Sequence, residues 1–236
     1  MKNTRLIAEF GSCHMGKLDR MIEAVDLCKK YGINALKFQL FPNNAPYVPT
    51  NIWLDPAVFK IVFDYAKMVG VDVSSSVFDE TSFNFLLQLK PSFIKFSYGK
   101  KDQINWINKT LENHIEAIVS CDVMTDHLIP KEATKLYCIP EYPVRYEVDF
   151  DTLFRKREKQ EVLGPNDSII CREFTTTGRF NGFSDHTLGF KQTIKAIKSG
   201  AGIIEKHIRL GYHDEICPDA FFAVNLIDFA KIREQD

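Results

Sequence analysis

The segment FSDHTLGFKQTIKAIKSGAGIIEKH, residues 183–207, predicts a strand, a helix and a second strand in immediate succession. Thr187 can cap the helix, which is expected to end at Gly200. A right-handed βαβ crossover brings the second strand back parallel to the first, so both strands end at the same edge of a sheet. His186 and His207 stand at those two ends. The segment therefore predicts two neighbouring imidazoles, and such a pair is typical of metal ligands.

The same alternation of strand and helix recurs along the chain at about 25 to 30 residues per unit, which is typical of a parallel sheet covered by helices. The other expected strands are residues 6–10, 35–40, 71–76, 93–97, 115–120 and 135–139. Eight such units predict an α/β fold, a single (β/α)8 TIM barrel.

The alternative architecture is an open doubly wound sheet. Its dinucleotide fingerprint G-x-G-x-x-G is not matched by GSCHMG at residues 11–16. We therefore expect residues 1–236 to form one catalytic barrel domain. A segment at about 161–181 fits no unit, and we expect an insertion or an added hairpin there.

Charge and composition exclude several classes of partner. A formal charge of −1 over 236 residues offers no broad attraction to nucleic acid or to an anionic membrane. No apolar run of about 18 residues predicts a membrane span, and MKNTRLIAEF does not resemble a secretory signal. The six cysteines contain no C-x-x-C pair, which favours free thiols over a disulfide framework. The expected location is the cytoplasm.

Polar side chains are expected at the mouth of the barrel, because reacting groups gather at the C-terminal ends of barrel strands. Lys37 and Gln39 share one face of their strand by the period of two, and Lys95 ends another strand. A buried lysine is costly unless an anion neutralises it. Two lysines at one mouth indicate a phosphate or carboxylate ligand, with hydroxyls from Ser76 and Ser120.

A purely structural explanation remains open for each charged residue. Either lysine could pair with an internal carboxylate such as Glu9 or Glu205. A single histidine is likewise more often structural than a metal ligand. Two lysines together with two histidines at strand ends favour a functional site.

Two motifs in the opening segment resemble a known family. SDHTLG at residues 184–189 and EKH at 205–207 are similar to the signatures of the sialic acid synthase family, which joins phosphoenolpyruvate to an N-acetylated amino sugar. In that family both histidines bind a divalent metal. The resemblance therefore implies a transferase with Mn²⁺ or Mg²⁺ held by His186 and His207.

The resemblance extends in short patches through most of the chain: IAE with His14 and Gly16, LKFQ at 36–39, SVFD at 76–79, YP at 142–143 and PD at 218–219. It implies a catalytic set of Glu9, Lys37, Gln39, Lys95, Tyr142 and Asp219. It implies phosphoenolpyruvate contacts from Ser76, Ser97, Ser120 and Ser184. Within the catalytic set, the resemblance implies that the lysines bind the phosphate and that the other side chains orient the sugar.

The chain departs from the family pattern at several positions. Pro140 replaces an asparagine, so one expected hydrogen bond to the substrate carboxylate is missing. Asp122 replaces a glycine of the phosphate-binding turn, and Tyr98 a serine after Ser97. The family's C-terminal antifreeze-like domain is expected to be absent, and a separately encoded domain of that type could replace it.

Two other functions remain open. In one, Cys121 or Cys138 joins the two histidines in a zinc or iron enzyme of different chemistry. In the other, the chain is a non-catalytic, sugar-binding relative. The expected partners are phosphoenolpyruvate and an acylated aminohexose, without nucleic acid or membrane. Apolar surface expected after Leu226 could support a homodimer.

Overall fold

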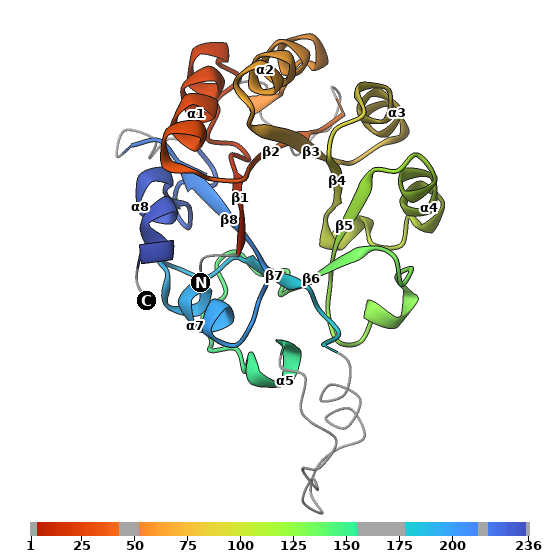
Figure 1. The fold of residues 1–236 in the computed structure, drawn as a ribbon, viewed down its shortest axis with the longest axis vertical. Coiled ribbons are helices and arrows are strands. Elements are labelled where there is room, and N and C mark those ends of the chain that lie inside the picture. Colours follow the sequence, from red (N-terminus) through yellow and green to blue (C-terminus); the bar gives the residue numbers. More distant parts are fainter. Residues whose placement is uncertain (1–3, 43–51, 155–177, 212–216, 235–236) are drawn as a thin grey trace, which may run out of the picture.

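A computed structural model describes residues 4–42, 52–154, 178–211 and 217–234, and in these ranges eight parallel strands close into a barrel (Figure 1). The strands are β1 Arg5–Glu9, β2 Ala35–Leu40, β3 Asp72–Val77, β4 Phe93–Phe96, β5 Glu116–Cys121, β6 Thr134–Cys138, β7 Gly182–Asp185 and β8 Ile203–Arg209. Pairing of β1 with β8, from Arg5 opposite Ile203 to Glu9 opposite His207, closes the ring. The predicted TIM barrel is confirmed.

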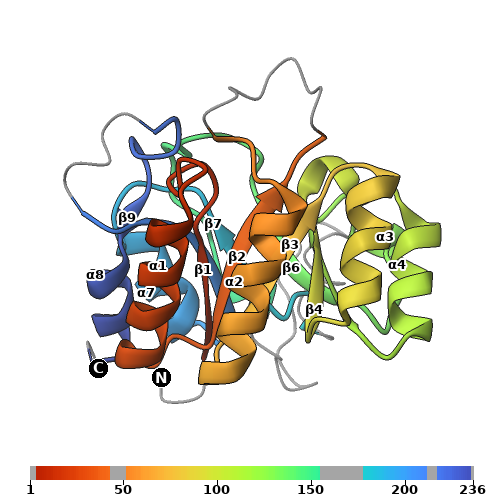
Figure 2. The same ribbon diagram turned by 90° about the horizontal axis from the view of Figure 1, so that it is seen from above.

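Helices surround the ring, and Figure 2 shows several of them standing alongside the strands. They are α1 Leu18–Tyr31, α2 Pro56–Val69, α3 Glu80–Leu89, α4 Ile104–Glu112, α7 Lys191–Lys198 and α8 Leu226–Ala230. Local sequence sets their ends: Asp55 accepts a hydrogen bond from Ala57 N just before α2, and Gly70 ends that helix with φ +77°. No helix in the described ranges is both long and apolar enough to cross a bilayer.

Two of the eight units show little helix in their described residues. Between β5 and β6 the chain makes a 3₁₀ turn, Asp126–Leu128, and after β6 it makes one helical turn, α5 Asp151–Phe154. The expected insertion at 161–181 falls mostly outside the described residues. Its last residue, Asn181, joins the barrel by hydrogen bonds with backbone groups of Lys135 and Gly202.

The predicted cap of the helix after β7 is wrong. The helix α7 begins at Lys191 rather than next to Thr187. Thr187 instead donates from its backbone N and its hydroxyl to Asp185 Oδ1. A short Asp-Thr turn thereby replaces the cap, because the carboxylate competes for the same donors.

The barrel interior changes character along its axis. One apolar cluster fills it: Ile7, Ala35, Phe93, Ile118 and Leu136. Two residues further along their strands, the positions on the same face are Glu9, Lys37, Lys95, Ser120 and Cys138. The C-terminal end of the barrel is therefore polar inside.

Apolar side chains that point away from the axis pack under the helices in a second, larger core. Leu226, Phe229 and Ile232 belong to that core and are fully buried. The expected exposed apolar surface after Leu226 is therefore wrong, because α8 packs this stripe onto the barrel. Within the described residues, this buried stripe is not available to a second copy of the chain.

Candidate active site

A cavity of about 350 Å³ opens at the C-terminal ends of the strands. Its walls include Lys37, Gln39, Ser76, Lys95, Ser97, Ser120, Tyr142, Ser184, His186 and His207. Of the predicted site residues, the other two lie just outside this wall: Glu9 is buried against Lys37, and Asp219 faces His207. The fold thus brings the predicted residues to one place.

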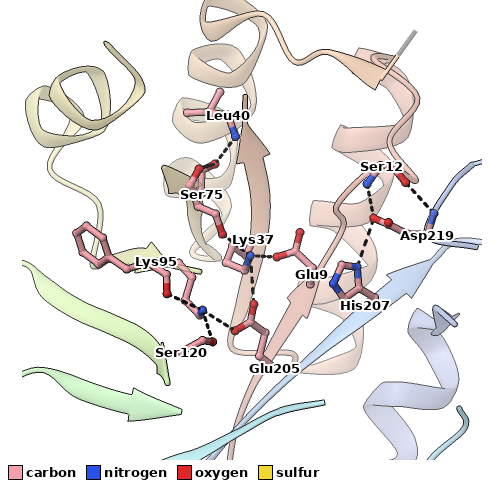
Figure 3. Close-up of polar contacts among 12 residues, drawn as sticks. Glu9, Ser12, Lys37, Leu40, Ser75, Lys95, Ser120, Glu205, His207 and Asp219 are labelled. Carbon is pink, nitrogen blue, oxygen red and sulfur yellow. Dashed lines mark hydrogen bonds and ion pairs between the residues drawn. The ribbon is translucent and has the colours of Figure 1, made fainter. Parts of the chain in front are cut away.

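Four buried charged residues, Lys37, Lys95, Glu9 and Glu205, form what we call the lysine–glutamate cluster (Figure 3). The Nζ atom of Lys37 forms ion pairs with Glu9 and, at 3.1 Å, with Glu205 Oε1. The Nζ atom of Lys95 lies 3.5 Å from Glu205 Oε2. Glu205 therefore links both lysines, and the internal pairing left open by the sequence occurs within the cavity.

Serine hydroxyls complete the surroundings of each ammonium group. Lys37 Nζ donates to Ser76 Oγ at 2.7 Å, and Lys95 Nζ donates to Ser120 Oγ at 2.6 Å. With two carboxylates and one hydroxyl, all three donors of Lys37 have partners. An anionic ligand must therefore share or displace some of these contacts.

Burial and pairing act in opposite directions on the cluster. Burial lowers the pKa of Lys37 to about 8, although Glu205 partly opposes this effect. For Glu205, burial alone would raise the pKa, but Lys37 and Lys95 outweigh it and lower the pKa to about 2. With both lysines charged, the two glutamates balance them and the cluster has no net charge.

The two histidines face each other across the mouth of the cavity, with ring centroids 5.7 Å apart. His186 Nδ1 lies 2.9 Å from the carbonyl oxygen of Ile139, and since a carbonyl only accepts, this nitrogen carries the proton. Burial lowers the pKa of His186 to about 4, and His207 adds to the effect. His186 is therefore neutral at pH 7 and presents Nε2 as a lone pair. The ring of Tyr142 lies 4.1 Å from that of His186.

Asp219 faces His207 from the segment after β8. Its Oδ2 atom lies 3.3 Å from His207 Nδ1 and accepts a hydrogen bond from Ser12 N at 2.7 Å. Burial alone would raise the pKa of Asp219, but His207 and Ser12 outweigh it and lower the pKa to about 2. The carboxylate therefore stays ionised beside the imidazole.

The histidine pair fits a divalent cation. In both rings Nδ1 faces a protein oxygen, which leaves the two Nε2 atoms as ligands, and outer-sphere contacts of this kind are usual at metal sites. Metal–nitrogen bonds of about 2.1 Å allow two imidazole centroids up to about 6.5 Å apart. Within the described part of the chain, no third His, Cys, Asp or Glu joins the pair in a cluster. A bound ion would keep positions for other ligands.

Thiolate ligation has little support. Cys121 packs in the outer core, where burial raises its pKa to about 12. Cys138 lines the cavity, and its Sγ lies 4.0 Å from His186 Nδ1, the nitrogen already bound to Ile139. Burial raises the pKa of the Cys138 thiol to about 11 in the metal-free site.

The expectation of free thiols is confirmed for Cys28, Cys121 and Cys138 and wrong for Cys13 and Cys217, which form a disulfide. They are 204 residues apart in sequence. Closure of the barrel brings the loop after β1 beside the segment after β8, which no cysteine spacing reveals. Cys171 lies outside the described residues.

Sequence reasoning named Glu205 only as a possible internal partner of one lysine, not as a residue of the site, and did not consider Ser12. A signal for Glu205 was present, since it stands two residues before His207 and so shares its inward face. Ser12 had no such signal, because its contact with Asp219 spans 207 positions.

A parallel barrel that gathers buried lysines, hydroxyls and paired imidazoles at its C-terminal strand ends belongs to the class of (β/α)8 barrels, whose functional sites lie at that edge. The family can be stated more narrowly. The chain belongs to the NeuB family, whose model matches residues 44–148 and 171–235.

Individual relatives agree with this assignment. The chain is 26% identical to the N,N'-diacetyllegionaminic acid synthase of Legionella pneumophila, over 87% of this chain and 64% of that protein. It is 22% identical to a pseudaminic acid synthase of Campylobacter jejuni, over 97% and 71%. The chain thus spans about two thirds of these relatives' length. A sialic acid synthetase from Leptospira borgpetersenii, solved with citrate, shares the fold with a TM-score of 0.77 at 18% identity, over 97% of this chain and 81% of that one.

Proposed function

We propose that this chain is the catalytic barrel of a nonulosonate synthase, which condenses phosphoenolpyruvate with an N-acylated amino sugar. The relatives named as synthases of legionaminic and pseudaminic acid support the reaction class. The observation that carries the proposal is that two buried lysines and two metal-ready imidazoles face one cavity. This combination suits an anionic substrate that reacts beside a divalent cation.

Phosphoenolpyruvate binds on the lysine side of the cavity. Lys37 and Lys95 supply the positive charge, and hydroxyls supply directed hydrogen bonds. The hydroxyls are those of Ser76, Ser97, Ser120 and Ser184. Because Glu9 and Glu205 already balance the lysines, a substrate anion needs further positive charge nearby, and the histidine pair is where a cation can supply it.

The metal of the site would be Mn²⁺ or Mg²⁺, and Nε2 of His186 and His207 would hold it. Mg²⁺ prefers oxygen ligands, so two imidazoles favour Mn²⁺ of these two. When bound, the ion supplies Lewis acidity to the carbonyl oxygen of the acceptor sugar. His186 keeps the required lone pair through its hydrogen bond to Ile139, and Tyr142 covers its ring.

The acceptor sugar lies on the histidine side of the cavity, beside His186 and His207. Gln39 and Tyr142 line this part of the cavity and can orient its hydroxyls. Glu9 and Asp219, which lie just outside the lining of the cavity, also help to orient the sugar. The new bond joins C3 of phosphoenolpyruvate to the sugar's carbonyl carbon. Water adds at C2, and the C2–O bond to phosphate breaks.

The remaining expectations belong to the same proposal. The protein acts in the cytoplasm on two small molecules. A second copy of the chain and a separately encoded C-terminal-type domain are the proposed protein partners. Co-expression with candidate domains and size-exclusion chromatography would detect either assembly.

A phosphate-release assay tests the function. Purified protein with Mn²⁺, phosphoenolpyruvate and a panel of N-acylated aminohexoses should release inorganic phosphate with at least one sugar. Phosphoenolpyruvate labelled with ¹⁸O at the bridging oxygen should transfer the label to phosphate, because the C–O bond breaks. Lys95→Met should abolish turnover, whereas Lys67→Met, on the outer helix α2, should not. Absence of turnover with every sugar, or label retained in the organic product, would contradict the proposal.

A further inference from the structure

Reciprocal hydrogen bonds join the first and the last loop at the mouth of the barrel. Ser12 N donates to Asp219 Oδ2 at 2.7 Å, and Asp219 N donates to Ser12 Oγ at 3.0 Å (Figure 3). Ser12 is buried. Next to this pair, Cys13 and Cys217 are linked by a disulfide. We call these four residues the clasp.

The backbone of the first loop is shaped for this contact. A Cβ atom at Gly11 would collide with Asp219 Oδ2 and would approach His207 Nδ1 to 3.3 Å. Glycine thus leaves room for the carboxylate between the loop and the imidazole. The close approach of loop, carboxylate and ring is therefore built into the sequence at this point.

The clasp determines the tautomer and the orientation of the His207 ring. Asp219 Oδ2 lies 3.3 Å from His207 Nδ1, and this buried nitrogen makes no regular hydrogen bond within the described residues, so the carboxylate is the group placed to pair with it. A carboxylate on Nδ1 favours the tautomer with the proton on that nitrogen and makes Nε2 a better donor to a metal. The same turn supplies Phe222, whose ring packs edge-on against His207 at 4.7 Å. One short segment therefore fixes both the tautomer and the plane of the ring.

We propose that Asp219 is a positioning residue for His207 and that Ser12 and the Cys13–Cys217 disulfide hold Asp219 in place, so that the clasp sets the affinity of the histidine pair for a divalent cation. This inference rests on the proposed metal site. It differs from a role of Asp219 on the sugar, because it predicts an effect with no substrate present. It also makes metal affinity sensitive to the redox state of two cysteines.

Calorimetric titration of the metal-free protein with Mn²⁺ tests the clasp without any activity measurement. Asp219→Asn should weaken binding by about 10-fold or more, the usual effect of losing an outer-sphere partner. Ser12→Ala keeps the carboxylate and its hydrogen bond from Ser12 N but removes the hydroxyl that accepts from Asp219 N, and should weaken binding by about threefold. Asp122→Asn changes a carboxylate at the same end of the barrel without contact to either histidine, and should leave the affinity unchanged. Thermal unfolding in chelator establishes that each variant is folded.

The disulfide provides a second, independent arm. A phosphine reductant with one water converts the disulfide into two thiols and the phosphine oxide, and wild-type protein should then bind Mn²⁺ about threefold more weakly. The Cys13→Ser, Cys217→Ser double variant should bind like the reduced protein and should not respond to the reductant. If a variant does not fold, this arm still decides the question with wild-type protein.

The outcomes separate the two proposals. Mn²⁺ binding that survives His207→Ala would overturn the metal site and this inference with it. Binding that requires His207 but is equal in wild type, Asp219→Asn, Ser12→Ala and reduced protein would leave the metal site intact and overturn the clasp.

Discussion

Tyr98 and Asp122 are hydrogen-bonded to each other across the ends of β4 and β5: the phenol hydroxyl donates to Asp122 Oδ2 at 2.5 Å. Both residues depart from the sequence pattern of the family, and the structure shows that the two departures contact each other. Asp122 also accepts hydrogen bonds from Met124 N and the Thr125 hydroxyl. Asp122 raises the pKa of Tyr98 to about 12, so the phenol keeps its proton at the cavity wall.

This pair should behave as a unit in mutants. Tyr98→Phe and Asp122→Asn should each destabilise the protein by about 1 kcal/mol, and the double variant should cost less than their sum. Urea unfolding of the wild type and the three variants measures the coupling energy. Additive losses would mean that the hydrogen bond contributes nothing beyond its two separate residues.

The two cavity lysines should differ in their effect on stability. Lys37→Met leaves buried Glu9 without its cation and Glu205 with only the longer contact to Lys95, and should destabilise the protein by about 3–5 kcal/mol. Lys95→Met should cost less, because Glu205 keeps its contact with Lys37. Denaturant unfolding measures these losses of stability. Lys60→Met, which removes a surface ion pair with Asp64, is the control. A Lys37→Met loss no larger than that of the control would refute the buried cluster.

Gly11→Ala should separate metal binding from stability. The added methyl group collides with the end of the Asp219 side chain, which can turn away, rather than with backbone. We therefore expect weaker Mn²⁺ binding in calorimetry and a melting temperature close to that of the wild type. A variant that binds Mn²⁺ as tightly as wild type would show that Asp219 need not occupy its present position.

His14 should contribute to acid sensitivity. Its Nδ1 accepts a hydrogen bond from Gly16 N, which requires the neutral ring, and burial lowers its pKa from 6.5 to about 4. Because the unfolded chain takes up this proton first, stability from His14 is full above pH 6.5 and is lost as the pH falls from 6.5 toward 4. The loss is at most about 1.4 kcal/mol per pH unit.

Urea unfolding of metal-free protein at pH 7, 6 and 5 checks this expectation. His14→Gln should have a shallower dependence of stability on pH than the wild type, and His127→Gln, at the surface, should not. Equal slopes for all three proteins would show that the pKa of His14 is the same in the folded and the unfolded protein.

Much of the barrel could be predicted from sequence because its local signals agree. The expected strand at 35–40 matches β2 Ala35–Leu40, since an apolar run is bounded by turn residues on both sides. Alternation along that strand also placed Lys37 and Gln39 on one face. Both line the cavity.

The parts that could not be predicted depend on contacts between distant residues. Thr187 resembles a helix cap in sequence, and only the carboxylate of Asp185 in the folded turn changes its partner. Glu205 was one of two possible partners for either lysine, and only the fold shows that it contacts both. The contact of Ser12 with Asp219 across the closure of the barrel had no signal in the sequence. Periodicity gives the face of a residue, but its partner depends on which strand ends meet.

The central claim is that the lysine–glutamate cluster and the histidine pair form one site for phosphoenolpyruvate and a divalent cation. A crystal structure of the protein with Mn²⁺ and phosphoenolpyruvate, with the metal located by its anomalous signal, tests it most directly. The account predicts one manganese peak at Nε2 of both His186 and His207, with the phosphate group bound by Lys37 and Lys95. Manganese elsewhere, or a ligand that leaves both lysines paired only with Glu9 and Glu205, would contradict it.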